Sequence, residues 1–106
     1  MSTVTGTFSV LVDGVETIHT ITDMPYPEFW GRQRKVLRVL DMTSDWGLDQ
    51  ILGVPPTYSG APTGDVGYRY QVDFSAGGTS EGANVWHGIP ADAAPVIGAA
   101  LNAAFA

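Results

Sequence analysis

The residues of this chain that could do acid–base chemistry are few. It has two histidines, His19 and His87, and no cysteine. A histidine can act as a general base near neutral pH. However, His19 falls on the apolar side of an alternating segment, and His87 follows a tryptophan near the end of another, positions typical of packed structural residues. We therefore assign no catalytic residue and expect the chain not to be an enzyme.

The carboxylates offer one spacing that could bind a metal ion. Asp41, Asp45 and Asp49 are four residues apart, so an unbroken helix would align them on one face, where oxygen ligands suit Mg²⁺ or Ca²⁺. The residues TSDWG at 43–47 indicate that the helix is interrupted there, and Asp45 fits the first turn of a new helix. The glycine-rich segment 77–82 lacks the lysine of a phosphate-binding loop. We expect no metal, no cofactor and no small-molecule substrate.

The charges are unevenly distributed along the chain. It has five basic and eleven acidic residues, for a net charge of −6. A basic helix could contact phosphates, but the negative field of the whole chain repels a polyanion, which argues against a nucleic-acid partner. The basic helix face is either solvated or meets the acidic face of a neighbouring copy or another protein. The basic residues that would make this contact are Arg32, Arg34, Lys35 and Arg38.

The segment 93–106 is predicted to form a helix without any charged residue. Ile97, Leu101 and Phe105 recur every four residues and define a core face. The opposite side is small and nearly apolar, and a helix that is apolar all round is usually buried all round. We therefore expect a protein partner on this helix. The predicted contact residues here are Gly98, Ala99, Asn102, Ala103 and Phe105, and Tyr58 is added from a preceding loop.

These side chains must be positioned by two hairpins and by helices. Apolar residues alternate over 4–12 and 15–22, and Asp13-Gly14 between them suits a two-residue type I′ turn. The pattern predicts an antiparallel hairpin in which Phe8 lies opposite His19.

The segment 28–41 is the clearest amphipathic helix in the chain. A strand over 35–42 is the alternative, because that stretch half-alternates. A short helix over 45–52 is predicted next, followed by a loop over 54–67 that is rich in proline and glycine. The predicted apolar arc of the first helix consists of Phe29, Trp30, Val36, Leu37 and Leu40.

The second half of the chain repeats the pattern of two strands and a helix. Strong alternation predicts a strand over 68–74, and a Gly/Ser loop over 75–83 leads to a fourth strand over 84–88. Asp92 is predicted to cap the terminal helix. The order ββααββα in one domain, 1–106, predicts an α+β fold in which helices cover one face of a four-stranded, mainly antiparallel sheet.

We expect a non-enzymatic structural or interaction protein, a small subunit that self-assembles or docks into a larger complex. The residue usage is typical of a GC-rich genome, and a phage virion or assembly component fits it. The first residues lack the features of a signal peptide and no stretch could span a membrane, so we expect a cytoplasmic or virion location. The alternative is a monomeric regulator or inhibitor. It would bind through the 54–67 loop and the aromatic residues Tyr58, Tyr68, Tyr70 and Trp86.

Overall fold

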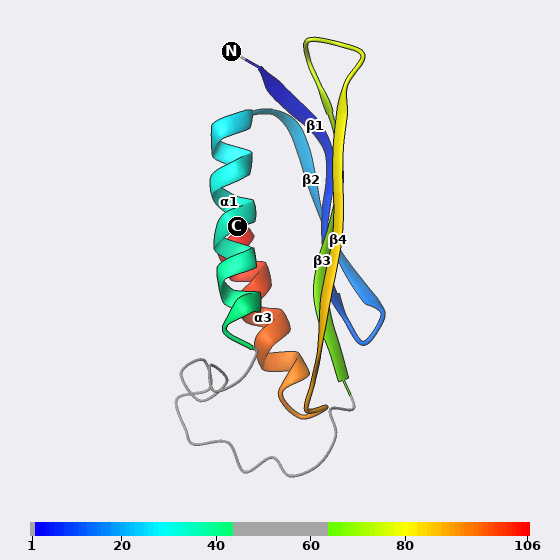
Figure 1. Ribbon diagram of the computed structural model, residues 1–106, viewed down its shortest axis with the longest axis vertical. Coiled ribbons are helices and arrows are strands. Elements are labelled where there is room, and N and C mark those ends of the chain that lie inside the picture. The colour runs from blue at the N-terminus through cyan, green and yellow to red at the C-terminus, as the bar shows by residue number, and fades with distance from the viewer. Residues whose placement is uncertain (1, 44–63) are drawn as a thin grey trace.

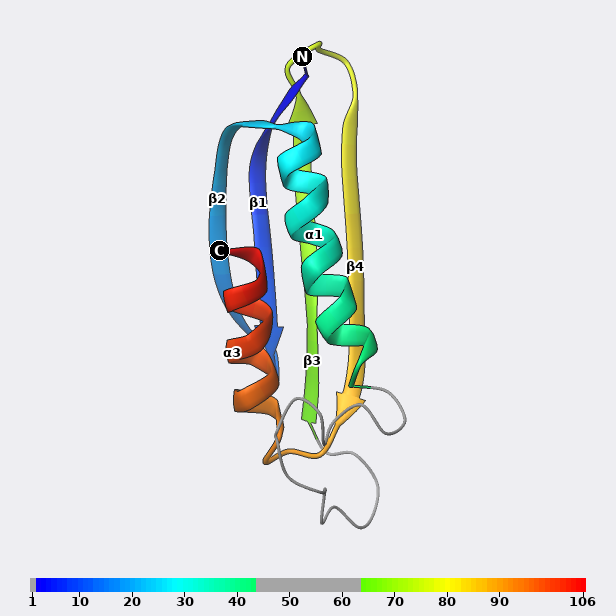
Figure 2. The same cartoon turned by 90° about the vertical axis from the view of Figure 1, so that its left-hand side faces the viewer.

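The computed structural model describes residues 2–43 and 64–106, so the predicted helix over 45–52 lies outside the described residues. The described elements are two hairpins, each followed by a helix. They form one four-stranded antiparallel sheet with both helices on the same side, an α+β fold (Figures 1 and 2). In chain order they are β1 (Thr3–Val12), β2 (Val15–Pro25), α1 (Tyr26–Asp41), β3 (Gly64–Phe74), β4 (Ser80–Ile89) and α3 (Ala94–Phe105).

The sheet has the strand order β2-β1-β3-β4, and every neighbouring pair is antiparallel. The first hairpin forms as predicted, with Phe8 opposite His19. Asp13 and Gly14 have φ values of 50° and 82°, which are those of the type I′ turn. Because β3 pairs with the free side of β1, the first strand of the chain becomes a central strand of the sheet.

The second hairpin extends further than predicted. β3 begins at Gly64 and β4 at Ser80, so the described residues 64–67 and 80–83, which the composition assigned to loops, are paired strand residues. Gly77, in the turn that remains, has a φ of 76°. Glycine and polar residues are weak strand formers by themselves, but the hydrogen-bond ladder to the neighbouring strand outweighs this local preference.

The first helix is confirmed, with a different buried face. α1 begins at Tyr26 and includes 35–41, so the alternative of a strand over 35–42 is wrong. The predicted apolar arc placed Trp30 in the core, but its side chain is 45% exposed, and Gln33 is buried at 5% exposure instead. The Gln33 amide donates a hydrogen bond to the Tyr68 hydroxyl at 3.0 Å. This bond satisfies the donor side of the buried amide, whereas the Gln33 Oε1 atom has no hydrogen-bond partner among the described residues.

The terminal helix begins without the predicted cap. Its N-cap is Ala93, and Asp92, which was predicted to cap it, is exposed. The Ala93 N–H donates to the carbonyl oxygen of Pro90 at 3.0 Å, so a backbone turn prepares the entry into the helix in place of a side chain. Pro95 lies in the first turn, where its missing N–H costs nothing.

The core lies between the sheet and the helices and is dominated by aromatic rings. Phe8 of β1 stacks on Phe105 of α3 with ring centroids 4.2 Å apart, and on Tyr68 of β3 at 5.2 Å. Phe29 of α1 meets the Phe8 ring edge-on at 6.4 Å. All four side chains are at most 2% exposed. Phe8 is therefore the point at which both helices meet the sheet.

Glu81 joins the edge strand β4 to the rest of the fold. The Tyr26 hydroxyl donates to one of its carboxylate oxygens at 2.8 Å, and the Tyr70 hydroxyl donates to the other at 3.0 Å. Burial, followed by the hydrogen bond to Glu81, raises the pKa of Tyr70 well above its usual range. For Tyr26 the hydrogen bond to Glu81 is the main cause of a raised pKa, and burial raises the pKa of Tyr68.

Raising the pH above about 10, the ordinary pKa of a phenol, is expected to lower the free energy of unfolding. The unfolded chain releases the phenolic protons near this pH, whereas the folded chain still holds those of Tyr26, Tyr68 and Tyr70. The part of the free energy of unfolding that comes from these three tyrosines is therefore fully present below this pH. It is lost as the pH rises towards their pKa values in the folded chain.

Denaturant titrations at a series of alkaline pH values measure this loss. In Glu81→Gln the loss should be smaller, because the carboxylate no longer holds the Tyr26 and Tyr70 protons in place. Equal pH profiles for the wild type and Glu81→Gln would contradict the role given to the carboxylate.

Candidate functional site

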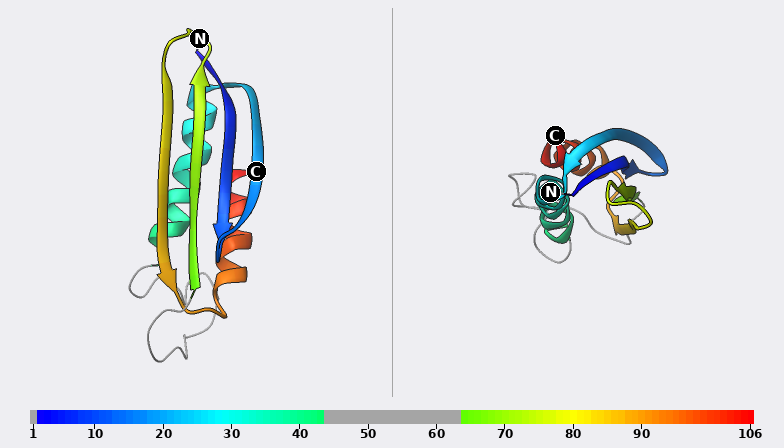
Figure 3. Two further views of the ribbon diagram at one scale, coloured as in Figure 1. Left: turned by 90° about the vertical axis from the view of Figure 1, so that its right-hand side faces the viewer. Right: turned by 90° about the horizontal axis from the view of Figure 1, so that it is seen from above.

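The side of the sheet opposite α1 and α3 is not covered by either helix (Figure 3). Side chains of a strand alternate between the two sides of a sheet, and in β4 every second residue from Ser80 to Gly88 is exposed while those between are at least partly buried. We call this side the bare face. It presents Thr3, Thr5, Thr7, Ser9 and Leu11 of β1, Glu16, Ile18 and Thr20 of β2, Asp65, Gly67, Arg69, Gln71 and Asp73 of β3, and Ser80, Gly82, Asn84, Trp86 and Gly88 of β4.

The bare face carries apolar side chains that water does not favour. An antiparallel sheet can leave one face in solvent, and that face is then polar. The threonines, amides and glycines of the bare face follow this rule. Ile18 and Trp86 do not, since they are 57% and 63% exposed. Tryptophan is among the residues most enriched at the centres of protein interfaces, so Trp86 makes this face the candidate contact surface.

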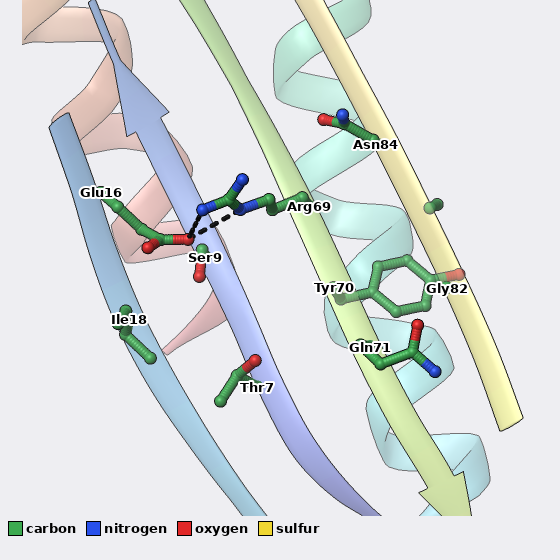
Figure 4. A pocket seen from close by; sticks show the side chains of 10 residues that line it. Thr7, Ser9, Glu16, Ile18, Arg69, Tyr70, Gln71, Gly82 and Asn84 are labelled. Carbon is green, nitrogen blue, oxygen red and sulfur yellow. Dashed lines mark hydrogen bonds and ion pairs between the residues drawn. The ribbon is translucent and has the colours of Figure 1, made fainter. Parts of the chain in front are cut away.

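Two hollows on the bare face adjoin along β3 and form a trough, and Figure 4 shows the side chains that line the larger one. The hollows have volumes of about 740 and 240 Å³ and share Arg69 and Asn84. The larger is lined mostly by hydroxyl, amide and charged groups. The smaller lies beside Leu11, Asp65 and Trp86. The trough therefore combines one aromatic wall with many hydrogen-bonding groups.

An ion pair crosses the larger hollow. The Arg69 guanidinium reaches over β1 to the Glu16 carboxylate, with both nitrogen–oxygen distances at 2.8 Å (Figure 4). Hydrogen bonds from Arg69 and then from Ser9 hold the pKa of Glu16 below its ordinary value. An exposed pair of this kind adds little to stability, because water screens the attraction. Its larger effect is to neutralise Arg69, so the net charge of the trough comes from Asp65.

The predicted basic residues lie on the opposite side of the molecule, along α1. Arg34, Lys35 and Arg38 are exposed, and the Arg34 guanidinium lies 5.7 Å from the centre of the Trp30 ring. Arg32 differs from them because it is used within the chain. Its guanidinium lies 3.7 Å from the Glu28 carboxylate and donates to the Phe105 carbonyl oxygen at 3.3 Å.

Of the residues of α3 that were predicted to contact a partner, some are buried in the core and others are exposed. Gly98 is buried against Val12 of β1, with no room for a larger side chain. Phe105 is 2% exposed in the aromatic core. These two residues belong to the core and not to a partner surface, because the first hairpin packs over this helix. Ala99 and Ala103 remain exposed, so a narrower uncharged strip is available.

Both histidines, and Asn102 with them, connect elements of the fold. The His19 ring donates from Nε2 to Asn102 Oδ1 at 2.7 Å and so links β2 to α3. The His87 Nδ1 lies 3.1 Å from the Leu40 carbonyl oxygen and links β4 to the end of α1. Both rings are on the helix side of the sheet, away from the trough.

The structure describes three of the four aromatic residues predicted for a regulator, and only one of these three is exposed. Tyr58 lies outside the described residues. Tyr68 is buried in the core, and Tyr70 is half-buried and bonded to Glu81. Among the described members of this aromatic set, Trp86 is the one whose side chain is exposed. Exposed and at least partly buried residues alternate along the whole of β4. This two-sided strand was not recognised from the sequence, because 80–83 was assigned to a loop and only 84–88 to a strand.

The described part of the chain does not contain the metal site considered for Asp41, Asp45 and Asp49. Asp45 and Asp49 lie outside it, and residues 2–43 and 64–106 contain no group of three potential metal-ligating side chains. In the same ranges no helix has the length and apolar character needed to cross a membrane. Comparisons with protein-family models, curated proteins and solved structures gave no match, so the function must be argued from the site itself.

Proposed function

We propose that this chain is a non-enzymatic assembly protein, a small subunit that associates through the bare face of its sheet. The observation that carries the proposal is the exposure of Trp86 beside a trough on a sheet whose other face alone is covered by helices. Burying a tryptophan and an isoleucine would remove apolar surface from water, which favours association. The polar groups around them supply the hydrogen bonds of an interface rim.

The arrangement of titratable groups supports binding more than catalysis. The two charged groups at the centre of the trough, Glu16 and Arg69, are committed to each other. The histidines are tied to Asn102 and Leu40 on the far side of the sheet. A general base needs to reach a bound substrate, and neither ring lies on the face that could bind one.

Replacing Trp86 by serine is expected to abolish self-association while leaving the fold intact. The wild-type chain should show a mass above its monomer mass of 11.2 kDa in light scattering after size exclusion, and the mass should fall on dilution. A tryptophan at the centre of an interface contributes at least about 2 kcal/mol, or roughly thirtyfold in the dissociation constant. The thermal unfolding temperature should stay close to that of the wild type, because the side chain is 63% exposed.

Val15→Ser is a matched control for the loss of exposed apolar surface. Val15 is 70% exposed next to the hairpin turn, in the edge strand at the other end of the sheet from the strand of Trp86, so its replacement should leave the mass unchanged. A wild-type chain that is monomeric at every concentration would contradict self-assembly. Association that persists in Trp86→Ser would place the contact away from the bare face.

A further inference from the structure

We propose that the smaller hollow of the bare face, between Trp86 and Asp65, binds the Arg38 guanidinium of a second copy of this chain. The inference rests on the proposed function and names its partner: the helical side of one copy packs on the bare face of the next.

The hollow is suited to a guanidinium group. Asp65 is opposite Gly88 and Trp86 is opposite Gly67, so the two side chains are diagonal neighbours across β3 and β4, a spacing that an aromatic side chain can span. Gly67 lies between them in the lining of the hollow, where β4 approaches so closely that a larger side chain would collide with Val85 and Trp86. An arginine placed there could stack on the indole ring and pair with the carboxylate.

The negative charge of the hollow is not neutralised from within. Asp13 lies beside Asp65, since its Oδ1 accepts a hydrogen bond from the Asp65 backbone N–H at 2.8 Å. The nearby cation, Arg69, is paired with Glu16. The Asp65 carboxylate next to an exposed aromatic ring favours a cationic partner over a neutral one.

α1 offers the complementary group. Arg38 is exposed in its last turn, and no ion pair of Arg38 or of its neighbour Lys35 occurs within residues 2–43 and 64–106. Arginine is the residue that matches both a carboxylate and an aromatic ring, because its guanidinium is planar. Arg38 is therefore the group of α1 that we place in the hollow of the second copy.

The placement of the helices brings further matching surfaces together. Seen from the helical side, α1 lies over β3 and β4, and α3 lies over β1 and β2 (Figure 2). A copy stacked in the same orientation would put its α1 over the hollow and its α3 over Ile18 and Leu11. The exposed residues of α3 there are uncharged, with Val96 46% exposed. Charge thus meets opposite charge while apolar surface meets apolar surface.

This contact joins two different surfaces, so it is heterologous and repeats into a ring or a filament. That property supplies the test, which uses Arg38→Glu, Asp65→Arg and an equimolar mixture of the two. Each variant alone should raise the dissociation constant by at least about tenfold, because like charges then face each other. In the mixture, position 38 of each variant meets an opposite charge at position 65 of the other, so association should return.

Light scattering of the four samples at low and high salt distinguishes the possible failures. Restored association in the mixture, weakened by salt, supports the proposal. Normal association of Arg38→Glu alone would overturn it and leave the proposed function standing, because two bare faces could then meet each other. A monomeric wild type would overturn both. Arg38→Lys should also weaken association, since an ammonium group cannot stack and pair as a planar guanidinium does, and full retention of affinity would count against the hollow as the binding site.

Discussion

Phe8→Ala is expected to lower the free energy of unfolding by about 3–5 kcal/mol, the cost of removing a fully buried phenylalanine. The Phe8 side chain is 0% exposed. Its ring packs against both Phe105 and Phe29, one from each helix, with centroid distances of 4.2 and 6.4 Å. The surrounding elements cannot collapse into the space left behind without moving both helices, so the cost should fall at the upper end of the range.

The measurement is denaturant unfolding followed by far-ultraviolet circular dichroism. Because small domains are stable by only about 5–15 kcal/mol, the variant should be unfolded at much lower denaturant. Ile18→Ala is the control, since Ile18 is on the neighbouring strand but 57% exposed on the bare face, and it should change stability by no more than about 0.5 kcal/mol. A loss below about 1 kcal/mol for Phe8→Ala would show that the helices are not held at this point.

Gly6→Ala is expected to destabilise the fold by about 3 kcal/mol or more, which is large for one added methyl group. Gly6 lies in the central strand β1, next to the irregularity in its pairing with β2. A Cβ atom there would fall on the Gln71 carbonyl oxygen and within 2.9 Å of the Val72 Cα. Both are backbone atoms of β3, so the two central strands would have to separate.

Gly31→Ala makes the same chemical change with the opposite expected sign. Gly31 is exposed within α1, and nothing lies within 4 Å of an added Cβ. Alanine is about 0.5–1 kcal/mol more favourable than glycine inside a helix, so this variant should be more stable than the wild type. Thermal unfolding of the pair measures both effects. Equal melting temperatures for the two variants would contradict the close approach of β1 and β3 at Gly6.

The elements of this fold could be predicted from local patterns in the sequence. Alternation over 4–12 and 15–22 with a turn pair between them predicted the first hairpin with its register, because one residue of slip would move every apolar side chain to the other face. The period of 28–41 predicted α1. These patterns are strong since they reflect which side of each element is buried.

The ends of elements and the exact buried set were less predictable. Residues 64–67 and 80–83 became strand by pairing with neighbours far along the chain, which local propensity does not include. Gln33 replaced Trp30 in the core because Tyr68 offers it a hydroxyl partner, and a helical wheel cannot show a partner on another element. The short helix and the loop predicted within 45–63 lie outside the described residues.

What the sequence determined by itself was a Cys-free α+β chain whose basic residues gather on one helix. Only the tertiary structure decided which surfaces are free. It buried Gly98 and Phe105 of the predicted contact helix, and it left Trp86 and Asp65 together on an uncovered face. The physical reason is that exposure depends on how helices and strands pack across the whole chain, whereas sequence periodicity shows only that each element has two sides.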